Sequence, residues 1–85
     1  MSHEKPRAIV LIQTDTGVEA SVMNELYKLP EVLDVYIVYG IYDIVAIIEA
    51  DTLEKIREVV ISKVRRIDGV RTTTTMIVVE GKTKK

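Results

Sequence analysis

The chain has 85 residues, enough for one small domain, with no cysteine and one histidine, His3. Disulfides and thiolate metal sites are therefore excluded, and a single core of this size gains from self-association. Twelve Lys and Arg residues against thirteen Asp and Glu residues give no broad basic field for nucleic acid. Apolar runs fall far short of the roughly 20 residues of a membrane span. We expect a cytoplasmic protein with no cofactor, metal, membrane or direct DNA contact.

The first half of the chain predicts a strand, a helix and a second strand. Residues 7–13 form an apolar strand candidate, and the loop 14–17 contains residues that can cap a helix. Apolar residues recur at helical spacing over about 18–29, and Pro30 ends that helix because the residue before a proline is pushed out of the α region. The second strand is expected over 32–39.

A hairpin carrying one carboxylate joins the two halves. The segment Tyr39-Gly40-Ile41-Tyr42-Asp43 lies between two strongly apolar runs, and Gly40 supplies the positive φ that short hairpin loops favour. Asp43 is thereby set at the mouth of a hydrophobic sheet, where an unpaired buried charge is costly. An Asp at a hairpin most often bonds nearby backbone amides, so this structural role is the default and ligand binding is the alternative.

The second half repeats the pattern of the first. A strand over 44–49 precedes a helix over about 52–67, which Asp68-Gly69 closes, and the last strand covers 70–79. One side of this helix is apolar and the other, which includes Arg57 and Arg65, is charged. The order β-α-β-β-α-β is that of the α+β ferredoxin-like sandwich, a four-stranded antiparallel sheet with two helices on one face. The single domain is expected over 6–82, between a disordered tail over 1–5 and a tail over 83–85.

The strands are apolar on both faces. In the first strand Ile9 and Leu11 point one way, and Val10 and Ile12 point the other. Helices cover only one face in this architecture, so the other face would be a large apolar patch, which soluble proteins rarely expose. We therefore expect that face to be buried against a second copy in a homodimer.

Four consecutive threonines occupy the last strand. Alternate residues share a face, so Thr73 and Thr75 present two hydroxyls in line. The default interpretation is a solvent-tolerant strand segment. With Asp43 the hydroxyls would also suit a small zwitterion, the Asp carboxylate binding an ammonium group and the hydroxyls a carboxylate. The strands concerned need not meet within one subunit, so assembly would have to bring these groups together.

Four short pieces, in this order and spacing, resemble the effector-binding (RAM) domain of the Lrp/AsnC transcription regulators: Leu29-Pro30-Glu31-Val32, the hairpin 39–43, Asp68-Gly69-Val70, and Thr73 and Thr75 before 77–80. The resemblance implies a ferredoxin-like domain of the dimeric α/β barrel type that dimerises through its sheet and often forms rings of dimers. It also implies that amino acids or related metabolites bind between dimers. The ligand-binding positions that it implies are Gly40, Tyr42, Asp43, Thr73 and Thr75, with Tyr39 as a weaker neighbour.

The sequence departs from a full regulator of that family at its start. Only about six residues precede the first strand, where a full regulator has a helix-turn-helix domain. The chain is thus expected to be a stand-alone effector domain that acts through full-length relatives or as a separate sensor.

Two other classes share this architecture. A small dimeric α/β-barrel enzyme, such as a monooxygenase, places polar catalytic groups between sheet and helices, whereas the interior positions here are almost wholly aliphatic. An RNA-binding sheet needs aromatic residues on its central strands, which here are aliphatic. We therefore expect no enzymatic activity, and keep the enzyme as the alternative.

Overall fold

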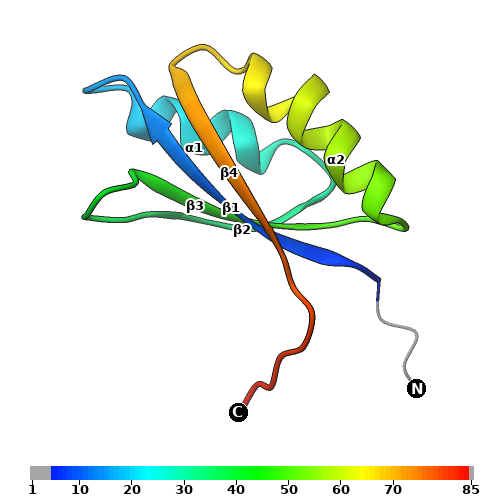
Figure 1. The fold of residues 1–85 in the computed structure, drawn as a ribbon. Helices are drawn as coiled ribbons and strands as arrows, with labels where there is room; N and C mark the ends of the chain where they lie inside the picture. The colour runs from blue at the N-terminus through cyan, green and yellow to red at the C-terminus, as the bar shows by residue number, and fades with distance from the viewer. Residues whose placement is uncertain (1–4, 85) are drawn as a thin grey trace.

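The computed structural model describes residues 5–84, so His3 and most of the expected tail over 1–5 lie outside the described residues. Its elements, in chain order, are β1 (Arg7–Thr14), α1 (Glu19–Tyr27), β2 (Val32–Ile37), β3 (Ile44–Glu49), α2 (Leu53–Ser62), the 3-10 helix η1 (Val64–Arg66) and β4 (Val70–Ile77). The strands pair antiparallel in the order β2-β3-β1-β4. Both helices lie on one face of this sheet (Figure 1). The predicted ferredoxin-like sandwich is confirmed.

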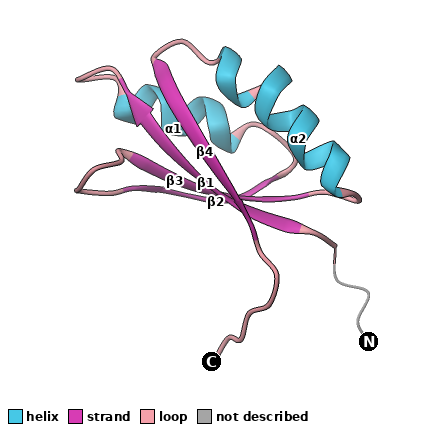
Figure 2. Ribbon diagram, in the orientation of Figure 1, coloured by secondary structure: helices cyan, strands magenta, loops and turns pink. Residues whose placement is uncertain are grey.

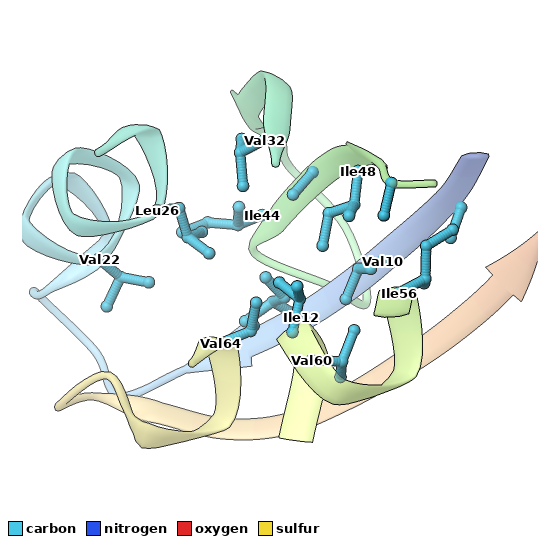
Figure 3. Close-up of a cluster of buried hydrophobic side chains, with 14 residues drawn as sticks. Val10, Ile12, Val22, Leu26, Val32, Ile44, Ile48, Ile56, Val60 and Val64 are labelled. Atoms are coloured by element: carbon cyan, nitrogen blue, oxygen red, sulfur yellow. The ribbon is translucent and has the colours of Figure 1, made fainter. Parts of the chain in front are cut away.

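An entirely aliphatic core fills the space between sheet and helices. On β1, Ala8, Val10 and Ile12 are fully buried while the residues between them are not. Their partners across the ladder to β3 are buried as well. Directly paired residues share a face, so these central strands present one complete face to the helices, where Val22, Leu26 and Ile56 meet it (Figure 3). Thr14, at the end of β1, is the one buried polar residue among 5–84.

Both helices are shorter than the sequence predicted. Helix α1 ends at Tyr27, and α2 ends at Ser62 instead of continuing to Ile67. At Lys63 the backbone leaves the α conformation, with φ −120°, and the chain continues as η1. A tighter 3-10 turn commonly closes a helix end, and here it still buries Val64. The continuous apolar stripe predicted one helix because the break hardly disturbs the stripe.

The outer strands also end earlier than predicted, as Figure 2 shows for β4. Strand β4 ends at Ile77, and only the Val78 N–H follows it, donating to the Arg7 carbonyl at 2.9 Å. Arg7 is the first residue of β1, so Val79 has no neighbouring strand to pair with. On the other side of the sheet β2 ends at Ile37 rather than at Tyr39.

The two joints between strand and helix are built differently. Thr52 caps α2 through its side chain, which accepts a hydrogen bond from the Lys55 N–H at 3.0 Å. The loop 14–17 provides no such cap, because Val18 is the residue at the N-cap of α1. Instead the Asp15 N–H donates to the Gly69 carbonyl at 2.8 Å, which ties the first joint to the turn before β4.

The helix-free face of the sheet is apolar at its centre. The pairs Ile9–Ile47 and Leu11–Val45 cross the two central strands there and are half-buried. Tyr36 and Met76, on the outer strands, extend the patch and are exposed. The prediction of strands with two apolar faces is therefore confirmed.

Among residues 5–84, neither helix has the length and apolar composition needed to cross a membrane.

Candidate functional site

The loop between β2 and β3 covers residues 38–43 and is wider than the tight turn predicted. The Val38 N–H donates to the Asp43 carbonyl at 2.9 Å and closes the loop at its base. Gly40 has φ +159°, close to fully extended and away from the left-handed values of a tight turn. Tyr39 and Ile41 hold their side chains in solvent, with relative exposures of 106% and 83%. The loop therefore presents two apolar side chains to anything that docks there.

Asp43 fixes this loop to the end of β1. Its backbone N–H donates to the Ile12 carbonyl at 2.9 Å, and its carboxylate oxygen Oδ2 accepts the Thr14 N–H at 2.8 Å. This bond to a backbone amide is the structural role expected by default for Asp43. The second oxygen, Oδ1, makes no hydrogen bond within residues 5–84, so the side chain retains an acceptor for a ligand.

A surface cavity of about 720 Å³ opens beside Asp43, and we call it the hairpin pocket. Its lining consists of Glu19, Ala20, Ile37, Val38, Tyr39, Gly40 and Asp43. The two charged residues in this lining are both acidic, so the pocket favours cations. Glu19 was missed by sequence reasoning, since a charged residue at the start of a helix carries no signal of its own in the sequence. Tyr42, a predicted site residue, is half-buried and lies outside this lining.

A second cavity, of about 450 Å³, lies between α2 and β4, and we call it the α2–β4 groove. Its lining consists of Leu53, Ile56, Arg57, Val60, Ile61, Arg65, Thr73, Thr75 and Ile77. Thr75 pairs with Val10 and Thr73 with Ile12, both buried under the helices. The two threonines therefore share one face, as predicted, and the structure shows that it is the helix face. The charged residues of this lining are both arginines. The groove thus combines guanidinium groups and hydroxyls with an aliphatic floor, and it favours anions.

Arg57 and Arg65 were assigned to a solvated helix side by the sequence pattern. Both are exposed, as that assignment implies, and both also line the groove. Every fourth residue from Leu53 to Arg65 lines this cavity, in the order Leu, Arg, Ile, Arg. Leu53, Arg57 and Ile61 share one face of α2, because residues four apart lie on one face of a helix. Arg65 continues the alternation of apolar and basic residues from η1, after α2 has ended.

The predicted site residues therefore divide between two cavities. Tyr39, Gly40 and Asp43 line the hairpin pocket, and Thr73 and Thr75 line the α2–β4 groove. The hairpin pocket adjoins β2 and the groove adjoins β4, which are the two outer strands of the sheet. Within one chain the two linings share no residue, and β1 lies between Asp43, which bonds its Ile12 and Thr14, and the threonine strand.

A chain of hydrogen bonds links the threonine strand to the hairpin loop. The Thr72 hydroxyl donates to Gln13 Oε1 at 2.6 Å, and Gln13 Nε2 donates to the Ile41 carbonyl at 3.1 Å. Gln13 lies on β1, between the two partners. Sequence reasoning missed Gln13, because nothing in the sequence pairs it with either partner.

The sequence has relatives among known proteins. The sequence matches the Lrp/AsnC ligand binding domain over residues 7–84. The chain belongs to this family. The HTH-type transcriptional regulator PF0250 of Pyrococcus furiosus is 38% identical over 73 residues, which cover 82% of this chain and 49% of that protein. This Lrp/AsnC domain thus spans about half the length of the curated relatives it matches.

Solved structures agree with the family assignment. The crystal structure of FFRP-DM1 is 36% identical, with a TM-score of 0.83, and the match covers 87% of this Lrp/AsnC domain and 99% of that chain. A transcriptional regulator of Neisseria meningitidis, solved as a complex with L-Met, has a TM-score of 0.78 at 17% identity, with 88% of this chain and 50% of that chain covered. At that identity the likeness concerns the fold alone.

Proposed function

We propose that this domain senses an amino acid or a related small metabolite and transmits its binding by assembling with further copies or with related transcription regulators. Membership of a ligand-binding family supports the sensing role, and relatives named as HTH-type transcriptional regulators support the regulatory one. The Neisseria meningitidis regulator that binds L-Met supports the amino-acid class of ligand.

The opposite charges of the two cavities carry this proposal. An amino acid is a zwitterion, and it needs an anionic group for its ammonium and a cationic or hydroxyl group for its carboxylate. Asp43 and Glu19 supply the first in the hairpin pocket, and Thr73 and Thr75 with the two arginines supply the second in the α2–β4 groove. The ligand therefore completes its contacts between two copies, the hairpin of one facing the groove of the other. The backbone amides of the loop around Gly40 can also donate hydrogen bonds to the carboxylate of the ligand.

A homodimer through the helix-free faces leaves both outer edges free for this contact. The apolar patch around Ile9, Val45 and Ile47 supports such a dimer, because an apolar face of this kind is stable when covered. Dimers that join edge to edge would then form a ring or another closed assembly. A ligand bound at each edge contact stabilises the larger assembly.

The domain is proposed to act in the cytoplasm without contacting DNA itself. Its relatives carry about as much sequence again outside the matched part, so a mixed assembly with such a regulator provides the route to DNA. Enzymatic activity is not proposed. The space between sheet and helices, where a small monooxygenase of this architecture places polar groups, is filled by aliphatic side chains.

A thermal-shift panel with the twenty amino acids and their 2-oxo acids tests the proposal, followed by light scattering on every ligand that raises the melting temperature. A ligand at 100 times its Kd adds about 2.7 kcal/mol to the stability, equivalent to a rise of roughly 10 to 20 °C for a domain of this size. We expect such a rise together with a larger assembled mass. A panel with no rise contradicts the sensing role, and a rise at constant mass contradicts binding between copies.

A further inference from the structure

The arginines of the α2–β4 groove have no partner of their own. Neither Arg57 nor Arg65 forms a salt bridge with another residue among 5–84, although Glu54 lies one helical turn before Arg57. Guanidinium groups present several donors in a planar fork that matches a carboxylate. Both side chains line a cavity with two hydroxyls and no acidic residue. The groove therefore has more capacity for anions than one carboxylate uses.

A solvated helix face explains this row poorly. Acidic residues three or four positions away stabilise an exposed arginine on such a face, but among residues 5–84 neither Glu54 nor Asp68 forms a salt bridge with these arginines. The residues four positions from Arg57 are Leu53 and Ile61, which are half exposed, at 52% and 51%. Exposed aliphatic side chains that alternate with unpaired arginines around a cavity fit a binding surface better, since the aliphatic groups cover the carbon chain of a ligand and the arginines its charges.

We infer that the ligand belongs to the acidic amino acids, molecules with two carboxylates and one ammonium group. The inference rests on the proposed function and names the ligand class of the same site. One carboxylate binds Arg65 or the threonine hydroxyls, the second binds Arg57, and the ammonium group reaches Asp43 of the neighbouring copy. A cavity of about 450 Å³ is within the usual range of roughly 300 to 1,000 Å³ for small-molecule sites. A basic amino acid would bring a like charge to the arginines, so we expect it to bind less well in the groove than an acidic one.

Two pairs of ligands of nearly identical shape test this class. Glutamate and glutamine differ by one charge, as do aspartate and asparagine, and each pair has nearly the same shape. Calorimetric titration of the full chain with both members of a pair therefore measures how much the extra charge adds to the binding affinity. A hydrogen bond to a charged group is about twice as strong as a neutral one. We expect at least one acidic ligand to bind tenfold or more tightly than its amide, with lysine and arginine binding less well than that acid.

Three variants locate the charge recognition. Arg57→Gln and Arg65→Gln should each reduce the preference for the acid over the amide tenfold or more. Arg66→Gln is the matched control, since Arg66 adjoins Arg65 in sequence but lines a different cavity, with Ser21 and Glu25. It removes the same charge and should leave the preference unchanged.

The outcomes separate this inference from the proposed function. Amides or apolar amino acids that bind as tightly as the acids overturn the inference and leave amino-acid sensing intact. An equal loss of preference in Arg66→Gln and Arg57→Gln also overturns it, because the effect is then one of net charge. No binding of any amino acid contradicts the proposed function and the inference together.

Discussion

The two halves of this domain have the same topology and opposite edge chemistry. In the first half a cavity lies beside α1 and the end of β2, and in the second a cavity lies between α2 and β4. Glu19 and Asp43 make the first acidic, and Arg57 and Arg65 make the second basic. The two cavities lie at corresponding places in the two halves, and the two charged side chains in each lining give them opposite charge.

This difference has a consequence for assembly. Two copies placed edge to edge bring an acidic cavity against a basic one, which is favourable, whereas like edges would repel. The contact is of the head-to-tail kind, so it builds a ring where the rotation closes. In the proposed assembly a zwitterionic ligand would offer its ammonium group to the acidic cavity and its carboxylate to the basic one.

The largest expected effect comes from the apolar face that both halves share. Ile47→Asp places a charge at the centre of the helix-free face, and burying an unpaired charge costs several kcal/mol. We expect the variant to dissociate to monomers or to unfold, as measured by light scattering and circular dichroism. Edge contacts between dimers would be lost as well.

Val79→Asp is the control for this substitution. Val79 follows β4 and is almost fully exposed, so the same new charge there should change neither mass nor stability. An Ile47→Asp protein with the assembly and melting temperature of the parent would show that the helix-free face is not the dimer contact.

A smaller effect is expected at the joint between the halves. Gly69 has φ +98°, and a Cβ built there would lie 2.7 Å from Val18 Cγ2 at the start of α1. Gly69→Ala therefore combines backbone strain with a steric clash and should destabilise the fold by about 2 to 4 kcal/mol in urea unfolding.

Gly17 separates these two causes. It has a similar φ of +91°, but nothing lies within 4 Å of the Cβ position. Gly17→Ala should cost only the backbone term, about 1 to 2 kcal/mol. Equal losses at the two glycines would mean that the contact between the turn and α1 does not constrain the fold.

The smallest effect on folding is expected at Asp43. Asp43→Asn keeps an oxygen that accepts the Thr14 N–H, so the stability of the empty protein should change little, while ligand binding should weaken by about 1.5 to 3 kcal/mol with the loss of the charge. Asp43→Ala leaves that N–H without its acceptor and should also destabilise the fold, by about 1 to 3 kcal/mol. Calorimetry and urea unfolding measure the two effects. Unchanged ligand affinity in Asp43→Asn would leave Asp43 with its structural role alone.

Local patterns predicted the fold because each element carries its own signal. The two apolar faces of β1 and the helical spacing of apolar residues before Pro30 are confirmed in the structure, where Val22 and Leu26 are buried. Strand ends were less predictable, since Ile77 ends β4 only because β1 begins at Arg7. The break of α2 at Lys63 could not be seen in the sequence, because Val60 before it and Val64 after it are both buried.

The candidate site was predictable only in part, for a different reason. Asp43, Thr73 and Thr75 carry a visible chemical pattern in the sequence, although their role in binding stays a prediction. Glu19 and Arg57 become site candidates only once α1 and α2 are placed beside the outer strands. Cavities formed between distant elements depend on the topology, and a charged residue on a helix looks the same in sequence whether it faces water or a groove.

Cross-linking between opposite edges tests the central claim, that the hairpin of one copy meets the α2–β4 groove of another. The chain has no cysteine, so single cysteines at Ile41 and Ile61 report unambiguously. The Ile41→Cys and Ile61→Cys chains, one carrying a tag that separates them by mass, are refolded together and oxidised with and without the amino acid that gives the largest thermal shift. We expect a mixed disulfide between the two variants, in a yield that the ligand increases. Only disulfides between identical variants, or none, would contradict it.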